Sequence, residues 1–162
     1  MAIDRIAGQL AALEMFRGLD DERLRRIARE ADRIIFRDGQ SIAEAGEDAD
    51  GGVLIVSGKA LTRAEPTTGS AEEFIEAGAL IGEMAMLTEH RCAVGVVAVG
   101  DVRAVKITRE ALHTLMQDDP ALAEHFQHRL TARLSRVALE LRLIDERLAA
   151  ACAMAGSAAA AG

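Results

Sequence analysis

Apolar residues recur at helical spacing at the start of the chain. Ile6, Leu10 and Leu13 fall on one face of a predicted helix. Asp20, a residue type that favours the N-cap position, precedes a second helix with a similar apolar stripe. Stripes of this kind usually pack into a core, so residues 1–31 are predicted to form an N-terminal helical segment.

The period changes to that of strands after residue 31. Short apolar or alternating runs, separated by Gly-containing turns, occupy residues 34–36, 41–44, 53–57, 59–63, 73–75, 92–99 and 102–107. A polar, Gly-rich loop is predicted over residues 45–52, and an exposed hairpin tip over residues 64–71. About eight short strands at this spacing favour a barrel or jelly roll over residues 32–107.

Helical spacing returns over residues 108–150. Thr108 is placed to cap one helix, and Pro120 suits the first position of the next. In this last helix the apolar residues alternate between spacings of four and three, at Leu130, Leu134, Val137, Leu141, Ile144 and Leu148. Nearly three heptads of this kind predict a coiled-coil seam and a parallel homodimer through the helix. The alternative is that the same stripe packs on the chain's own barrel.

These patterns together predict an α+β fold. Its centre is an antiparallel β-roll, a jelly-roll-like double-stranded β-helix, flanked by N-terminal helices and a long C-terminal helix. Half of the 162 residues are hydrophobic, with four Phe and neither Trp nor Tyr, so the core must be mostly aliphatic. The Ala- and Gly-rich residues 151–162 are predicted to be a disordered tail.

Charge and cysteine content narrow the possible functions. The net charge of −7 argues against a nucleic-acid binder, which normally carries a basic face. Two cysteines without a secretion signal indicate a reducing compartment. No segment reaches the ~20 apolar residues needed to span a membrane, so a cytoplasmic location without a membrane partner is expected.

One stretch, residues 81–94, carries candidate binding chemistry. Gly82 can take backbone angles closed to other residues, and the good helix formers after it predict a single helical turn. Free N–H groups at the start of such a turn favour an anion, and Arg91 supplies a fork suited to phosphate oxygens. Glu83 would repel phosphate but could accept hydrogen bonds from a sugar hydroxyl. A phosphate next to a sugar hydroxyl indicates a small cyclic nucleotide.

The stretch also resembles a known family. Gly82-Glu83-Met84-Ala85 followed by Arg91-Cys92-Ala93 is similar to the phosphate-binding cassette of cyclic nucleotide-binding domains. These domains occur in catabolite-activator-type regulators, protein kinase A regulatory subunits and cyclic-nucleotide-gated channels. The resemblance runs from about Phe16 to about Leu148, through the ordered set Phe16-Arg17-Gly18-Leu19, Gly39, Gly46-Glu47, Val53-Leu54-Ile55-Val56-Ser57-Gly58 and Gly78.

The resemblance implies a ligand, cAMP or cGMP, and no other cofactor. It implies that the ligand-binding residues are Ile81, Gly82, Glu83, Met84, Ala85, Arg91, Cys92, Ala93 and Arg133. Arg91 and nearby backbone N–H groups would contact the phosphate, and Glu83 would contact the ribose. In the family the helix after the roll closes over the base, which implicates Arg133 or its neighbours Arg129 and Arg136.

The chain departs from the family pattern next to the arginine. His90 stands where the family usually has Pro, and Cys92 stands where it usually has Ser, Ala or Thr. A thiol is a weaker donor than a hydroxyl. Without the family pattern, Arg91 could be a surface residue paired with Glu89, and Glu83 a helix N-terminal acid.

Other functional classes remain as alternatives. A metal-dependent jelly-roll enzyme would need several converging His, and only His90 of the four lies near a predicted strand, so neither catalysis nor a metal is expected. The carboxylates of residues 45–52 do not have the spacing of a calcium loop. The chain is expected to be a stand-alone receptor domain. It could instead be a domain that lost its ligand and serves dimerisation, or the sensor part of a transcription regulator.

Overall fold

The structure, a computed structural model, describes residues 2–63 and 71–160. The chain divides into two compact units, residues 1–123 and residues 124–162. The predicted hairpin tip falls almost entirely on residues 64–70, which lie outside the described residues.

The first unit begins with two helices and a short turn between them. They are α1 (Ile3–Ala12), a 3₁₀ turn (Glu14–Phe16) and α2 (Asp21–Glu30). Asp20 caps α2 as predicted, because its side chain accepts the backbone N–H of Arg23 at 2.9 Å. The apolar stripes are buried at Ile6, Leu10, Phe16, Leu24 and Ile27.

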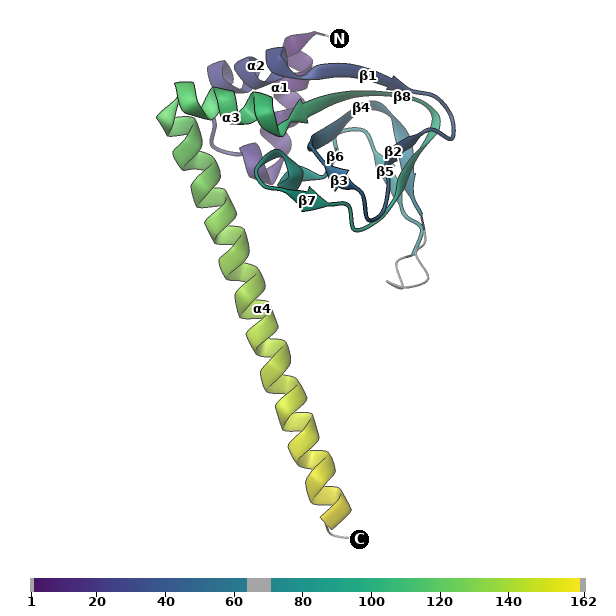
Figure 1. The fold of residues 1–162 in the computed structure, drawn as a ribbon, viewed down its shortest axis with the longest axis vertical. Coiled ribbons are helices and arrows are strands. Elements are labelled where there is room, and N and C mark those ends of the chain that lie inside the picture. Colours follow the sequence, from purple (N-terminus) through teal and green to yellow (C-terminus); the bar gives the residue numbers. More distant parts are fainter. Residues whose placement is uncertain (1, 64–70, 161–162) are drawn as a thin grey trace. The chain divides into compact units, whose positions relative to one another are not determined.

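Eight strands form the roll within the described residues. They are β1 (Asp32–Phe36), β2 (Ser41–Ala43), β3 (Asp48–Ala49), β4 (Gly51–Thr62), β5 (Phe74–Glu76), β6 (Leu80–Ile81), β7 (His90–Arg91) and β8 (Val96–Thr108). The larger sheet has the order β1-β8-β4-β5, with β2 paired to β8 and β6 to β4. A second sheet pairs β3 with β7, and all pairs are antiparallel. The helices α1, α2 and α3 gather at one end of this roll (Figure 1).

The two longest strands correct the sequence prediction. Each was expected to be two strands joined by a turn, at Gly58 in β4 and at Asp101 in β8, but each is continuous. Gly58 has a φ of +92° and Gly100 a φ of +70°. The β4–β8 pairing shifts register on both sides of Ser57, so the glycine region of β4 bulges and bends the strand without ending it.

The first half of β4, residues 51–56, is buried on both faces. Val53 and Ile55 belong to the core inside the roll, with partners Ala60, Val96, Ala98, Val102 and Ala104. Leu54 and Val56 point to the opposite face because side chains alternate along a strand, and they are also buried. The α1 side chains Arg5 and Gln9 donate to the carbonyl of Val56 at 3.4 and 3.3 Å. Sequence alone predicted this continuous apolar run as a buried strand.

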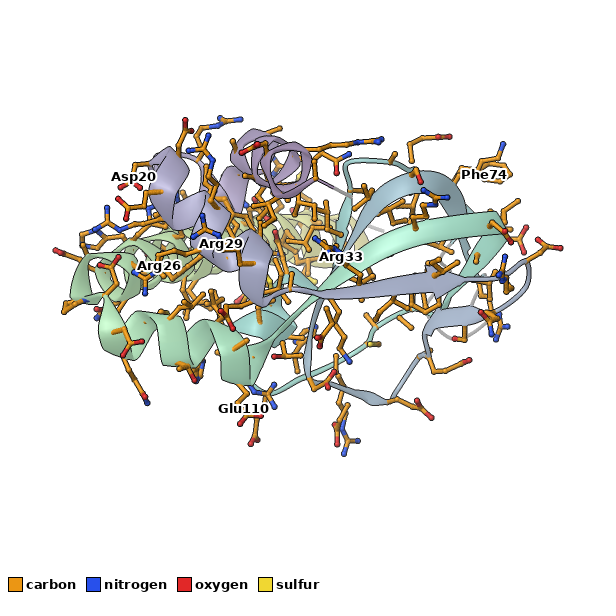
Figure 2. The ribbon with its side chains drawn as sticks, turned by 90° about the horizontal axis from the view of Figure 1, so that it is seen from above. Asp20, Arg26, Arg29, Arg33, Phe74 and Glu110 are labelled. Carbon is orange, nitrogen blue, oxygen red and sulfur yellow. The ribbon has the colours of Figure 1, made fainter. Side chains whose placement is uncertain are left out.

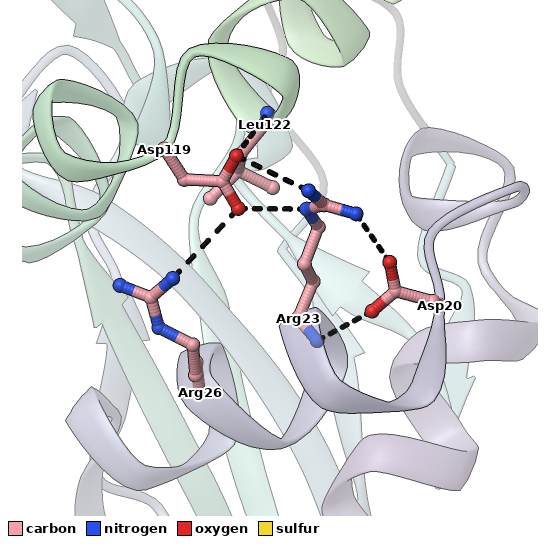
Figure 3. A network of polar contacts seen from close by, with 5 residues as sticks. All are labelled: Asp20, Arg23, Arg26, Asp119 and Leu122. Atoms are coloured by element: carbon pink, nitrogen blue, oxygen red, sulfur yellow. Dashed lines mark hydrogen bonds and ion pairs between the residues drawn. The ribbon is translucent and has the colours of Figure 1, made fainter.

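Helix α3 (Arg109–Asp118) follows β8 directly, and α4 (Pro120–Ala160) begins two residues after α3 ends. Thr108 caps α3 as predicted, by accepting the N–H of Ala111 at 3.2 Å. Asp119 joins the two helices to α2 (Figure 3). Its carboxylate accepts Nε of Arg23 at 2.7 Å and the N–H of Leu122 at 3.3 Å, and it lies 3.7 Å from Arg26.

The second unit consists of the remainder of α4. The helix continues through Ala160, so residues 151–160 are helical where the sequence predicted a disordered tail. The physical reason is that alanine has the highest intrinsic helix propensity, and a single glycine such as Gly156 costs only about 1 kcal/mol. The predicted stripe is exposed at Leu134, Val137, Leu141, Ile144 and Leu148. Among the described residues, no helix combines the length and apolar character that crossing a membrane requires.

Candidate functional site

The predicted helical turn after Gly82 is present as a 3₁₀ turn, Glu83–Met86. Gly82 has φ +73° and ψ +38°, a left-handed conformation that L side chains rarely adopt. Ala85 donates its backbone N–H to the carbonyl of Gly82 at 3.0 Å and is buried with Met86. Gly82 therefore reverses the chain after β6 and sets the direction in which the turn begins. Residues 81–94 are called the cassette below.

Two glycines at the start of β4 let neighbouring segments approach closely, Gly52 the cassette and Gly51 strand β8. A Cβ on Gly52 would come within 2.9 Å of the Met86 side chain. A Cβ on Gly51 would come within 2.3 Å of the Ile107 carbonyl oxygen on β8. The sequence prediction placed both glycines in a polar loop and missed this packing role, for which a Gly-Gly pair directly before a buried strand is a signal.

Arg91 lies on β7 and pairs with Asp48 on β3. Its Nε is 3.0 Å from Asp48 Oδ1, and the two residues are direct partners in the β3–β7 ladder. Their side chains are 74% and 81% exposed. Arg91 thus forms an exposed ion pair, with Asp48 as its partner where the sequence alternative expected Glu89. Pairs this exposed contribute about 1 kcal/mol at most, so another anion can replace the carboxylate.

A hollow of about 280 Å³ lies between the cassette and the β2–β4 region, and is called the cassette hollow below. Ile81, Gly82 and Cys92 line it from the cassette. The other lining residues include four carboxylates and one lysine, namely Glu44, Glu47, Asp48, Asp50 and Lys106. Its charge is thus more negative than a phosphate site normally carries.

Three of the four carboxylates have cationic partners. Asp48 pairs with Arg91, Asp50 lies 2.7 Å from Lys106 Nζ, and Glu44 lies 3.5 Å from Arg63. The hydrogen bond from Lys106 lowers the pKa of Asp50 below its ordinary value, against the opposing effect of burial.

Cys92 contributes a neutral thiol to the cassette hollow. It is half-buried, and burial raises the pKa of the thiol, with a further rise from the nearby Glu47 carboxylate. A protonated thiol can donate a weak hydrogen bond, whereas a thiolate would repel an anion. The state of Cys92 is thus compatible with a phosphate neighbour.

The structure brings together most of the predicted ligand-binding residues. Ile81, Gly82 and Cys92 line the cassette hollow, and Glu83, Met84 and Ala85 form the adjoining 3₁₀ turn. Arg91 reaches a lining residue, Asp48, and Ala93 follows two positions after β7. Arg133 lies on α4 in the second unit and is half-buried.

A second hollow, of about 610 Å³, lies at the helical end of the first unit. Arg26 and Arg29 of α2 and Glu110 of α3 are among the residues that line it. Figure 2 shows these residues at the helical end, with Phe74 at the far end of the roll. No cassette residue lines this hollow, and its lining mixes both signs of charge. It offers no chemistry that points to one ligand.

Comparisons with known proteins identify the fold and family. The family model of the cyclic nucleotide-binding domain matches residues 33–119, more than half of the chain. A cyclic nucleotide-binding-like protein from Brucella abortus bv. 1 str. 9-941 is 26% identical with a TM-score of 0.64, covering 70% of this chain and 99% of that one. No curated protein matches the chain.

Two further solved structures share the fold. The N-terminal domain of a transcriptional regulator from Streptomyces coelicolor A3(2) is 20% identical with a TM-score of 0.70, covering 80% of this chain and 92% of that one. The Thermus thermophilus catabolite activator protein is 29% identical with a TM-score of 0.61, covering 81% of this chain and 62% of that one. With its β-roll and cassette, and with the family model matching residues 33–119, the chain belongs to the cyclic nucleotide-binding domain family.

Proposed function

We propose that this protein is a receptor for a cyclic nucleotide, cAMP or cGMP, with a regulatory and not a catalytic role. The observation that carries the proposal is the cassette itself. The left-handed Gly82 starts a helical turn beside the cassette hollow, and Asp48, the partner of Arg91, lines that hollow. The match to the family model supports the same ligand class.

In the proposed complex Arg91 exchanges Asp48 for the nucleotide phosphate. The exchange is feasible because the side chains of both Arg91 and Asp48 are exposed to water. Backbone N–H groups near Ala85 and Ala93 and the thiol of Cys92 would complete the phosphate contacts. A charged fork with neutral donors suits a singly charged cyclic phosphate.

Glu83 would accept hydrogen bonds from the ribose hydroxyl, and Ile81, Gly82 and Met84 would line the sugar. We also propose that Arg133 of α4 contacts the purine base. The C-terminal helix would close over the site if the ligand binds the closed position of the helix more tightly than the open one. A ligand shifts the balance between two states only through its difference in affinity for them.

The proposal includes a homodimer through α4. In the single chain the side chains of the predicted seam are exposed to water: 60% at Leu134, 61% at Leu141 and 59% at Leu148. A stripe at heptad spacing is covered when a second helix packs on it. We propose a receptor that acts by itself, with the sensor part of a larger transcription regulator as the alternative.

A second candidate function is a dimerisation module that binds no nucleotide. The observation that favours it is the lining of the cassette hollow by Glu44, Glu47, Asp48 and Asp50, since carboxylates repel a phosphate. In this function α4 would serve the dimer and the roll would serve as a scaffold.

Calorimetric titration separates the two functions. The protein is unfolded and refolded to remove any carried-over nucleotide and is then titrated with cAMP and with cGMP. Binding by the wild type that weakens by roughly 1.5–3 kcal/mol in Arg91→Ala, the scale of a charged hydrogen bond, would support the receptor.

The matched control is Arg37→Ala. Arg37 is also an exposed arginine held by a single carboxylate, with its Nη1 2.6 Å from Asp101 Oδ2. Its replacement should leave nucleotide affinity unchanged. No heat with either nucleotide in the wild type would favour the dimerisation module, and equal losses in both variants would remove Arg91 from the site.

A further inference from the structure

The apolar stripe of α4 places leucines and β-branched residues at different positions of the heptad abcdefg. The a positions are Leu134, Leu141 and Leu148, and the d positions are Leu130, Val137 and Ile144. In a parallel pair of helices each layer joins a to a and d to d. Parallel dimers favour the reverse order, with β-branched residues at a and leucine at d. The stripe therefore fits a parallel two-helix seam poorly.

An antiparallel pair removes this mismatch, because each of its layers joins an a residue of one helix to a d residue of the other. In the register that covers the most of the stripe, Leu141 of one copy faces Ile144 of the second copy. Val137 likewise faces Leu148. Each central layer then joins a leucine to a β-branched side chain, and these four residues are all exposed in the single chain.

The alanine-rich end of α4 completes the same seam. Ala151 and Ala155 continue the heptad toward the C-terminal end and are exposed. In the antiparallel register they face Leu134 and Leu130 of the second copy, so each outer layer joins a large side chain to a small one. In a parallel pair each alanine would face its own copy and bury little apolar surface. The helical residues 151–160 thus contribute more to an antiparallel seam.

The charged residues beside the stripe separate the two orientations, because positions e and g flank the seam. Glu140 and Arg147 occupy g positions and Asp145 an e position, and all three are exposed. In a parallel pair g lies beside e of the other helix, so Glu140 would meet Asp145 twice in the dimer. In an antiparallel pair g lies beside g, so Glu140 meets Arg147 of the second copy twice. Repulsion in one orientation is thus attraction in the other.

The same charges select one antiparallel register. In the register described above, Asp145 lies beside the neutral Ala138 of the second copy. A shift by one heptad in one direction would place Glu140 beside its own copy. A shift in the other direction would place Arg147 beside its own copy, and Asp145 likewise. Both shifts create like-charge pairs, which are destabilising.

We propose that the α4 stripe binds a second copy of this chain in antiparallel orientation, with Glu140 of each copy beside Arg147 of the other. The inference rests on the homodimer proposed above and specifies its orientation and register, for which heptad spacing alone predicted a parallel pair. The side chains that cover the stripe are those of the same helix from the second copy, in reverse order.

Reversing one charge tests the orientation, because the two orientations predict opposite effects. Glu140→Arg places an arginine beside Arg147 in the antiparallel pair. The dissociation constant of the dimer should then rise about tenfold at low salt, as two exposed pairs turn from attraction to repulsion. In a parallel pair the same change would place an arginine beside Asp145 and tighten the dimer. Sedimentation equilibrium of the full chain measures the constant.

Two further variants complete the charge test. Adding Arg147→Glu to Glu140→Arg should restore the wild-type dissociation constant, because the pair is then reversed. Asp145→Arg is the control. Beside Ala138 it should change the constant less than about twofold, whereas in a parallel pair it would meet Glu140 and tighten the dimer. A tighter dimer in both Glu140→Arg and Asp145→Arg would overturn the antiparallel orientation.

Cys152 provides a direct distance between the two copies. It is exposed, and Cys92→Ser removes the other thiol of the chain. In the antiparallel register Cys152 lies at the level of Arg133 of the second copy. The two Cys152 residues are then about 30 Å apart, at a rise of about 1.5 Å per residue. In a parallel pair they lie at one level, and spin labels on them would be roughly 20 Å apart or less. Pulsed electron paramagnetic resonance measures this distance, and the short value would overturn the proposal.

The inference and the function on which it rests fail in different ways. A monomer at every concentration would defeat the homodimer and its orientation together. A tetramer, which the order of leucine at a and isoleucine at d favours in parallel assemblies, would overturn the two-helix seam. A parallel dimer would overturn the orientation and leave the homodimer in place. Nucleotide titration of the wild type decides the receptor function separately.

Discussion

Arg91 is the residue on which the proposed chemistry depends most, and its present partner is a carboxylate. Asp48 lies 3.0 Å from its Nε and lines the cassette hollow. A phosphate must therefore compete with Asp48 for the guanidinium and must also approach the Asp48 charge. The exposure of both side chains keeps this competition weak.

Replacing Asp48 by Asn should strengthen nucleotide binding. The amide removes the competing charge and keeps the size of the side chain, so affinity should rise about two- to fivefold, as expected for an exposed pair worth about 1 kcal/mol or less. Calorimetry with cAMP and cGMP measures the change. Asp101→Asn, at the exposed partner of Arg37, is the control. A weaker complex with Asp48→Asn would mean that Asp48 itself serves the ligand.

Gly82 allows the 3₁₀ turn to form, because the turn begins directly after its left-handed backbone. Gly82→Ala should lower the free energy of unfolding by about 1 to 2 kcal/mol, the cost of a left-handed L residue. Denaturant unfolding measures it. Gly8→Ala is the control, because Gly8 lies within α1 with no atom near its missing Cβ, and alanine there should stabilise. Equal stability of Gly82→Ala and wild type would mean that the turn relaxes.

The joint between α3 and α4 depends on the charge of Asp119. The hydrogen bond from Arg23 holds the pKa of this carboxyl below its ordinary value of 3.8. Because the folded-state pKa is lowered, the carboxylate stabilises the fold above the unfolded value, and that contribution is lost as pH falls through the folded value.

Asp119→Asn should therefore lower the melting temperature at neutral pH. The amide can still accept the N–H of Leu122, so the change isolates the charge. The difference from wild type should shrink as pH falls from 3.8 through the lower folded-state pKa, where the carboxyl of the folded wild type also becomes protonated. Thermal unfolding from pH 7 downward measures it. Asp118→Asn, one residue earlier and exposed, is the control and should leave the melting temperature at neutral pH nearly unchanged.

Elements with strong local signals were predictable from the sequence. Asp20, Thr108 and Pro120 mark helix starts where the structure has them, because a cap or a fixed φ acts locally. The two-residue strands β3 and β7 were not predicted, because they exist only through pairing with each other. Gly58 was misread as a turn for the same reason, since only the β4–β8 pairing makes it part of a bulge.

The candidate site was predictable in part. The cassette residues 81–94 follow one another in sequence, so their pattern could be recognised directly. Asp48 and Lys106 come from other segments, and no spacing links them to the cassette. Their roles follow from the close approach of the cassette to β4, which Gly52 permits, and of β8 to β4, which Gly51 permits.

On the scale of the whole molecule, the exposed stripe of α4 predicts self-association. Leu141→Arg places a charge in the proposed seam and should convert a dimer to a monomer, because a buried unpaired charge is strongly unfavourable. Light scattering or sedimentation measures the mass. Leu139→Arg is the control, since Leu139 is also exposed, at 57%, but lies off the heptad stripe. A dimer that persists in Leu141→Arg would exclude this seam.

The pairing of β4 with β8 runs from Gly51–Thr108 to Thr62–Val96 and encloses residues 63–95. Folding must close that long segment before its main ladder can form, so this closure is expected to limit the folding rate. The cassette lies within the enclosed segment and adds few strand pairs of its own. Mutations that change ligand preference can therefore accumulate there while the folding route stays the same, which lets one scaffold diverge to answer different signals.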